Sequence, residues 1–285
     1  MGLNLMNKAT PKIGDNIMRN AEPLPKETTK QVESVEKALC LLECFSDRSP
    51  ELSLKQLSEK TGLYKSRILR LCGTLIAHGF LIRMDGSAYR LGPALLMLGK
   101  VYERSNSLIS LARPVLRELA SLTGQSAKIF IVEGTRRMCL AREKGTYPLR
   151  YAVNEGETFA LHAGASGKVL LAYSSPEFRK TIMNRTLQRI TEATITARDR
   201  LEKEFDSICK RGYATSKGEV VPEVAGIAAP VFGHNNEIVA AIALSGLIQH
   251  FTKERSQEMC KHLLAASQKL SELLGCKDFP LKSVC

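Results

Sequence analysis

The chain has 285 residues, of which 44% are hydrophobic and 25% are charged, and its formal net charge at pH 7 is +12. Such a length can hold two domains, each with its own core, and the positive charge favours an anionic partner. No apolar run approaches the roughly 18 residues that a membrane-spanning helix needs, and residues 1–30 lack the apolar core of a signal peptide. We therefore expect a cytoplasmic protein that does not contact a membrane.

The eight cysteines of the chain form no C-x-x-C pair and have no histidines near them at ligand spacing. This pattern argues against a metal site. Most of the cysteines stand in apolar patterns, where a free thiol behaves as a small hydrophobic side chain. A redox role for one of them stays as the alternative. We expect no metal and no other cofactor.

The sequence patterns that follow residue 30 predict helices. Residues 1–30 are dotted with prolines and lack periodicity, so we expect a flexible tail there. Apolar residues then recur at helical spacing over residues 35–45, which predicts an amphipathic helix. A short second helix begins with a capping box at Ser53 and Gln56 and stops at Gly62.

A third helix is expected from about Tyr64 to His78, followed by a hairpin whose turn is at Asp85-Gly86. Helix, short helix, tight turn, helix and hairpin is the order of a winged helix-turn-helix. Its third helix can enter the major groove of DNA, while basic residues at the hairpin can touch phosphates. A three-helix unit with a solvated basic face is the alternative. The predicted DNA-binding residues are Lys55, Tyr64, Lys65, Ser66, Arg67, Arg70, Thr74, Arg83 and Arg90.

Two further helices, opened by Gly92-Pro93 and ended by Gly124, are expected to connect two domains. Beyond them the pattern changes to strands mixed with helices, which predicts an α+β domain with a largely antiparallel sheet. We expect Thr196 to start one of its helices and Leu273 to be buried in the last one. The predicted strands are 128–132, 138–142, 224–232 and 238–245, and the predicted helices are 166–173, 176–183, 197–210 and 252–274. The expected domains are residues 1–30 and 277–285 as tails, 31–92 as the winged helix-turn-helix, 93–123 as a helical linker and 124–276 as the C-terminal domain.

The stretch HAGASGK, which begins at His162, looks like a phosphate-binding loop but has the wrong spacing. The G-x-x-x-x-G-K-[ST] pattern requires glycine at the position of His162 and a hydroxyl at the position of Val169. We instead predict a helix start where the amides of Ala165, Ser166 and Gly167 receive a carboxylate. A tight contact between helix and sheet, which requires small side chains, is the alternative.

Two other classes of protein fit less well. The chain has no G-x-S-x-G motif, and its five histidines stand in unrelated contexts, so no nucleophile, base and orienting group can be assigned. We therefore expect no enzyme. A sensor without specific DNA binding is the other alternative, and the basic third helix argues against it.

Six stretches of the chain, in order and regularly spaced, carry a family resemblance. They are SVEKALCLLECF (34–45), LSLKQLSEKTGLYKSRILRL (52–71), HGFLIRMDGSAYRLGPALLMLG (78–99), LHAGASGKVLLA (161–172), RGYATSKGEVVPEVAGIAAPVF (211–232) and AAIALSG (240–246). With them the chain resembles the IclR family of bacterial transcription regulators. The resemblance implies a winged helix-turn-helix, a helical linker and a C-terminal effector-binding domain of GAF-like fold. It also implies operator DNA as partner, an organic or aromatic acid as effector, a dimer or dimer of dimers, and action as a repressor or an activator.

The resemblance also implies which residues bind the effector, and several of them depart from the family pattern. Ser216, Gly226 and Ala243 replace a frequent acid, cysteine and serine, so we predict a roomier, less polar pocket and a larger or more apolar effector. Tyr64 and Arg67 stand where the family often has proline and a small or polar residue, so we predict an altered operator choice. The expected effector-binding residues are His162, Ala165, Ser166, Gly167, Ser216, Glu219, Gly226, Ala243 and Ser245.

Overall fold

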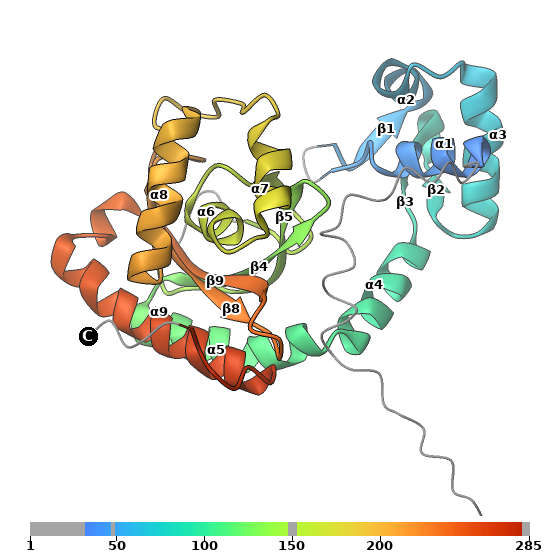
Figure 1. The fold of residues 1–285 in the computed structure, drawn as a ribbon. Helices are drawn as coiled ribbons and strands as arrows, with labels where there is room; N and C mark the ends of the chain where they lie inside the picture. The colour runs from blue at the N-terminus through green and yellow to red at the C-terminus, as the bar shows by residue number, and fades with distance from the viewer. Residues whose placement is uncertain (1–31, 47–48, 148–152, 281–285) are drawn as a thin grey trace, which may run out of the picture. The chain divides into compact units, whose positions relative to one another are not determined.

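The structure is a computed structural model that describes residues 32–46, 49–147 and 153–280. The tail expected over residues 1–30 lies outside these residues, as does the end of the second tail from residue 281 onward. The described chain forms two compact units, one that ends at Asn106 and one that begins at Ser107 (Figure 1).

The N-terminal unit combines helices with a small antiparallel sheet of order β1-β3-β2. Its elements are α1 (Glu33–Leu42), β1 (Glu51–Ser53), α2 (Leu54–Thr61), α3 (Lys65–Ala77), β2 (Leu81–Arg83), η1 (Asp85–Ser87), β3 (Ala88–Leu91) and α4 (Pro93–Ser105). Their apolar side chains meet in a core around Leu41, Leu57 and Ile68. The expected order of a winged helix-turn-helix is confirmed, and β1 is an addition that the sequence pattern did not predict.

Residues at the two ends of α2 determine where the turn between α2 and α3 begins. Ser53 Oγ accepts from the amide of Gln56 at 3.3 Å, and Gln56 Oε1 accepts from the amide of Ser53 at 2.8 Å, which confirms the capping box. Gly62 ends α2 with a φ of 70°, a left-handed conformation that glycine adopts without strain. The chain therefore reverses within a few residues and starts α3 at Lys65.

Two details of this unit differ from the expectation. The hairpin turn is a short 3-10 segment, in which Ser87 has a positive φ of 69°. In α1 the apolar residues Val35 and Leu39 are 55% and 54% exposed, while Leu41 is fully buried. The apolar side of α1 is thus only partly used by the core of its own chain.

The C-terminal unit is built on a sheet of order β6-β5-β4-β9-β8-β7, antiparallel throughout. Its strands are β4 (Ser126–Glu133), β5 (Arg136–Glu143), β6 (Thr158–Ala160), β7 (Ala214–Lys217), β8 (Val224–Phe232) and β9 (Ile238–Leu247). Its helices are α5 (Ser107–Thr123), α6 (Ala165–Ala172), α7 (Pro176–Met183), α8 (Arg198–Arg211), η2 (Ile248–His250) and α9 (Lys253–Leu273). The predicted α+β class is confirmed.

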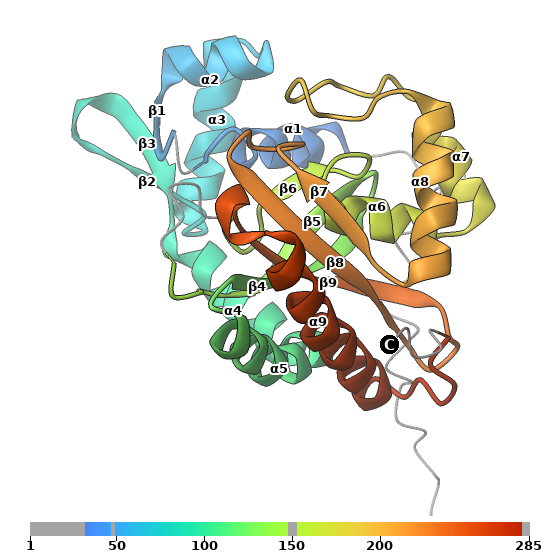
Figure 2. The ribbon, with the colours of Figure 1, turned by 90° about the vertical axis from the view of Figure 1, so that its left-hand side faces the viewer.

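Helices cover both faces of this sheet (Figure 2). Side chains alternate along each strand, so Ile129 and Ile131 of β4 pack against α5 and α9, and Lys128 and Phe130 point to the opposite face. On that opposite face α6 lies against the sheet, with α7 and α8 outside it. We call it the α6 face of the sheet.

Three expectations for this unit need correction. The helix pair expected as a linker is divided, because α5 packs on the sheet of the C-terminal unit while α4 stays with the N-terminal one. Leu273 is 50% exposed, since it falls beyond the buried stripe of α9. The cap of α8 is Ala197 and not Thr196, and its side chain makes no capping hydrogen bond. In the part of the chain that the structure describes, no helix is long and apolar enough to cross a bilayer.

Candidate functional site

One face of α3 is polar and open to solvent. Ile68 and Cys72 on the other face fill the core of the N-terminal unit, and this fixes which side chains point outward. Lys65, Ser66, Arg70 and Thr74 are exposed, and Tyr64, just before the helix, is 85% exposed. The beginning of α3 therefore offers positive charge and hydrogen-bond donors without an acidic residue in its first turn.

Arg67 differs from the other basic residues of α3. It is half-buried, and its Nη2 lies 2.9 Å from Oε1 of Glu33 at the start of α1. A carboxylate therefore already neutralises this guanidinium. A DNA phosphate or base would have to compete with Glu33 for Arg67.

The remaining basic candidates lie on α2 and the hairpin. Arg83 and Arg90 are exposed, and Arg90 lies 3.9 Å from Glu51. Lys55 lies 3.9 Å from Glu59 one turn further along α2. Ion pairs this long between exposed groups are weak and easily exchanged for a phosphate. The predicted DNA-binding residues thus belong to one unit, and their contacts with DNA stay a prediction.

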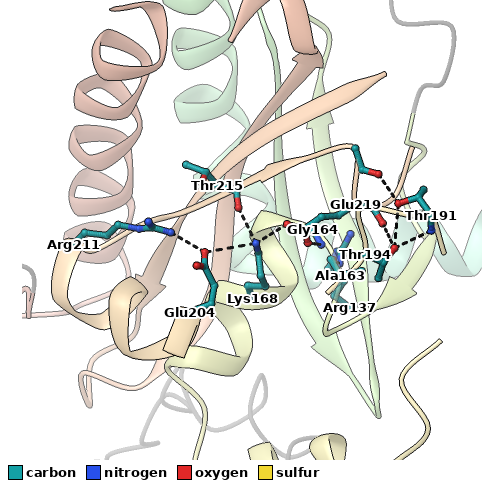
Figure 3. A network of polar contacts seen from close by, with 11 residues as sticks. Arg137, Ala163, Gly164, Lys168, Thr191, Thr194, Glu204, Arg211, Thr215 and Glu219 are labelled. Carbon is teal, nitrogen blue, oxygen red and sulfur yellow. Dashed lines mark hydrogen bonds and ion pairs between the residues drawn. The ribbon is translucent and has the colours of Figure 1, made fainter. Parts of the chain in front are cut away.

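The start of α6 is held by a buried ion pair (Figure 3). Lys168 is 2% exposed and Glu219 6% exposed, and Lys168 Nζ donates to Glu219 Oε1 at 2.6 Å. The second carboxylate oxygen of Glu219 accepts from the amide of Gly164, the N-cap of α6, at 2.8 Å. Lys168 also donates to the carbonyl of Thr215 at 2.8 Å and lies 3.6 Å from Glu204. A carboxylate of the protein therefore already occupies the Gly164 amide, next to the amides of Ala165, Ser166 and Gly167 that are expected to receive a ligand carboxylate.

A second buried cation lies beside this loop. Arg137 donates to the carbonyls of Ala160, at 2.7 Å, and Ala163, and its guanidinium lies over the rings of Phe130 and Phe159. Burial lowers its pKa to about 10. These contacts fasten the stretch before α6 to β5.

The small residues of the HAGASGK stretch also have a packing role. A Cβ added at Gly167 would lie 2.2 Å from the carbonyl oxygen of Leu161 and 2.7 Å from Arg137 Nη1, too close for any side chain. The tight contact that was the alternative explanation is therefore present at this position. Binding of a ligand by the amides of Ala165, Ser166 and Gly167 stays a prediction.

His162 is buried and hydrogen-bonded in this structure. It is 4% exposed, and its Nε2 lies 2.9 Å from the carbonyl oxygen of Gln188. Because a carbonyl can only accept, Nε2 carries the proton. Burial lowers the pKa of His162, so the ring is neutral at physiological pH.

The four candidates on the strands share the α6 face. Ser216, Gly226 and Ser245 lie side by side on β7, β8 and β9, and Ala243 is two residues from Ser245 on the same side of β9. A Cβ added at Gly226 would lie 3.6 Å from Ser216 Oγ and 3.7 Å from Ser245 Cβ. The sheet therefore brings these positions together, with hydroxyls on both sides of a residue that has no side chain.

One residue that the sequence reasoning missed lies next to them. Lys128 of β4 is 2% exposed, pairs in register with Ala243, and donates from Nζ to Ser245 Oγ. Burial lowers its pKa to about 8. A signal was present, because a lysine at an alternate position of the apolar run SAKIFIV falls on the buried side of a strand.

Known protein families match both units of the chain. The family model for the IclR helix-turn-helix domain matches residues 34–83, and that for the bacterial transcriptional regulator IclR C-terminal domain matches residues 101–272. The HTH-type transcriptional regulator KipR of Bacillus subtilis is 28% identical over 243 residues, which cover 85% of this chain and 97% of KipR.

Solved structures show the same fold. A putative IclR regulator from Silicibacter sp. TM1040 superposes with a TM-score of 0.77 at 29% identity, over 88% of this chain and all of that one (100%). An IclR homologue of Microbacterium hydrocarbonoxydans, solved in complex with 4-hydroxybenzoate, superposes with a TM-score of 0.75 at 20% identity, over 85% and 98% of the two chains. Since a winged helix-turn-helix and the matching C-terminal domain follow each other over most of its length, the chain belongs to the IclR family of bacterial transcriptional regulators.

Proposed function

We propose that α3 of the N-terminal unit binds a specific operator and that a small organic acid, bound on the α6 face of the C-terminal sheet, changes this binding. The observation that carries the DNA part is the exposed polar side of α3, where Tyr64 is 85% exposed and Lys65 and Arg70 stand beside it. Such a side of a helix fits the major groove and its phosphates. The transcription regulators among the relatives support the same assignment.

The experiment for this part is a titration of labelled DNA with the full-length protein. The DNA is the region upstream of the chain's own gene, and the competitor is a shuffled sequence of equal length. We expect specific binding that weakens steeply with salt, because lysine and arginine displace counterions from phosphates. Equal affinity for both sequences contradicts an operator-specific regulator.

The effector part rests on the row Ser216, Gly226 and Ser245, with Ala243 next to it. Glycine and alanine carry little or no side chain, so we propose an effector larger or more apolar than a two- or three-carbon acid. The Microbacterium homologue with 4-hydroxybenzoate suggests an aromatic acid as the first probe. A calorimetric screen should find binding of benzoates and weaker binding of glyoxylate and pyruvate. Binding of the small hydrophilic acids alone contradicts this choice.

We further propose a homodimer. Over the described residues α4 has no buried side chain, and Leu96, Met97 and Val101 are 66%, 69% and 54% exposed. A helix this apolar and exposed calls for a protein partner, and a second copy would also supply the second recognition helix, about 34 Å away, that adjacent major grooves require. Sedimentation should give a dimer for the wild type and a smaller species for Met97→Glu. A monomeric wild type contradicts the proposal.

Regulation then follows from linkage between the two sites. An effector that favours one arrangement of the two recognition helices shifts the population between binding and non-binding dimers. Operator and effector must then change each other's affinity by the same factor. Identical effector affinity with and without operator DNA contradicts the coupling.

A further inference from the structure

Buried cations lie at the α6 face, and one of them, Lys128, makes a single hydrogen bond within the described chain. Lys168 is neutralised by Glu219 and Glu204, and Arg137 is surrounded by carbonyl oxygens and aromatic rings. Lys128 is as deeply buried, yet among the described residues its ammonium contacts only the neutral hydroxyl of Ser245. A buried charge without a partner is costly, which makes it a candidate for a ligand-binding group.

A second cation stands next to Lys128 and increases the local positive charge. Arg142 of β5 lies directly across the strand pair from Lys128. Its Nη1 donates to the carbonyl of Val153 at 2.9 Å, whereas its Nε is buried and has no hydrogen-bond partner within the described chain. Two donors, Lys128 Nζ and Arg142 Nε, therefore have hydrogen-bonding capacity that the described protein groups do not use.

Among the described residues no ion pair neutralises Lys128, and Glu155, which accepts from the backbone amide of Arg142, is itself paired with Arg113. From β5 Lys128 faces Arg142 and the thiol of Cys139, and from β9 it faces Ser245 and Ala243. Burial, and after it Arg142, lower the pKa of Lys128 to about 8, and burial raises the pKa of Cys139 to about 12, so the thiol stays neutral. At neutral pH this part of the α6 face is positive.

We propose that Lys128, with Arg142 beside it, binds the carboxylate of the effector, so that the site selects monoanionic carboxylic acids over their neutral analogues. This proposal rests on the proposed effector function and adds the residue that anchors the carboxylate of the effector. The ammonium donates to one carboxylate oxygen, the hydroxyl of Ser245 donates to the same carboxylate, and the small residues Gly226 and Ala243 face the remainder of the molecule.

The test uses matched pairs of ligands on the full-length protein at neutral pH. Acetate, benzoate and 4-hydroxybenzoate are each compared with their primary amide, up to about 100 mM, a concentration at which even millimolar binding raises the midpoint of thermal unfolding. We expect the acids to raise the midpoint and the amides to have no effect. Equal shifts for acid and amide, or no shift with any acid, overturn the proposal without any mutant.

Variants then assign the effect to Lys128. In Lys128→Met the calorimetric affinity for the acids should fall about tenfold or more, as expected for the loss of a charge-assisted hydrogen bond. The control Lys261→Met, at an exposed position of α9, should bind like the wild type. Equal binding by Lys128→Met and the wild type overturns the anchor.

A second readout separates this proposal from the proposed function. Acid binding near pH 8 should be accompanied by proton uptake, seen as a dependence of the binding enthalpy on the ionisation enthalpy of the buffer. Operator release by the acids is measured in parallel. Binding at Lys128 without operator release contradicts the regulatory function and leaves the anion site intact, whereas release that survives Lys128→Met contradicts the anchor and leaves the function intact.

Discussion

The two units of the molecule differ in the exposure of their basic side chains. In the N-terminal unit the basic side chains of α3 and the hairpin are exposed, apart from Arg67, and Arg67 has Glu33 as its partner. In the C-terminal unit Lys128 and Arg137 of the sheet, and Lys168 of α6 packed against it, are 2%, 5% and 2% exposed. Exposed charges change stability little and are available to DNA, whereas buried ones change stability strongly. Mutations of equal chemistry should therefore have different consequences in the two units.

The largest effect is expected for the buried pair around Lys168. Lys168→Met leaves the buried carboxylate of Glu219 with the amide of Gly164 as its one donor among the described residues, and the loss of one partner of a buried pair typically costs about 3–5 kcal/mol. Urea denaturation should show this loss of unfolding free energy. Lys203→Met, at an exposed position of α8, is the control and should change it little.

The pair also predicts strong coupling. In Lys168→Met the carboxylate of Glu219 stays charged without its partner, and Glu219→Gln removes that charge. The double variant should therefore lose less unfolding free energy than the two single variants lose in total. Additive losses would mean that Glu219 and Lys168 act independently. In that case the contact at 2.6 Å would not be what holds the start of α6.

Replacing Lys128 should change the stability in the opposite direction to replacing Lys168. Because its pKa falls from 10.5 to about 8 on folding, the folded protein binds fewer protons than the unfolded chain between these pH values, and stability rises with pH there. Below pH 8 the buried charge costs on the order of 3 kcal/mol. Lys128→Met removes this cost, so it should stabilise the protein most below pH 8 and progressively less toward pH 10.5.

The measurement is the unfolding free energy of both proteins over this pH range. Lys261→Met is the control, because it makes the same substitution at an exposed position. A variant that is less stable than the wild type at neutral pH would show that Lys128 has a compensating partner, and the idea of an unneutralised cation would be wrong.

These buried cations also mark the limit of what the sequence predicts. Signals within one element were sufficient for the capping box at Ser53, the exposed side of α3 and the alternation of β4, since each depends on neighbours a few residues apart. Lys168 and Glu219 are separated by 51 residues, and their pairing depends on β7 lying next to α6. The isolation of Lys128 is likewise a property of three strands together, so the pattern shows that it is buried but not that it lacks an anion.

A moderate effect confined to DNA binding is expected in the N-terminal unit. Arg70→Ala removes an exposed side chain from the middle of α3, and a bidentate contact with a base is worth about 1–3 kcal/mol, or roughly 5- to 150-fold in Kd. The unfolding free energy should not change. Arg200→Ala, at an exposed position of α8, is the matched control for the loss of one positive charge. If both variants bind the operator equally well, α3 does not enter the groove as proposed.

The smallest effect is expected for the ion pair between Glu33 and Arg67, because both side chains are partly exposed, at 66% and 41%. Glu33→Ala should lower stability by less than about 1 kcal/mol. It also frees Arg67, so operator affinity should rise and the slope of log K against log salt should steepen by about 1 if Arg67 gains a phosphate contact. Glu36→Ala is the control, since it removes the same charge from the first turn of α1. Equal affinity gains in both variants would mean that only the general charge of α1 matters, and that Arg67 serves the packing of α1 against α3 and not the operator.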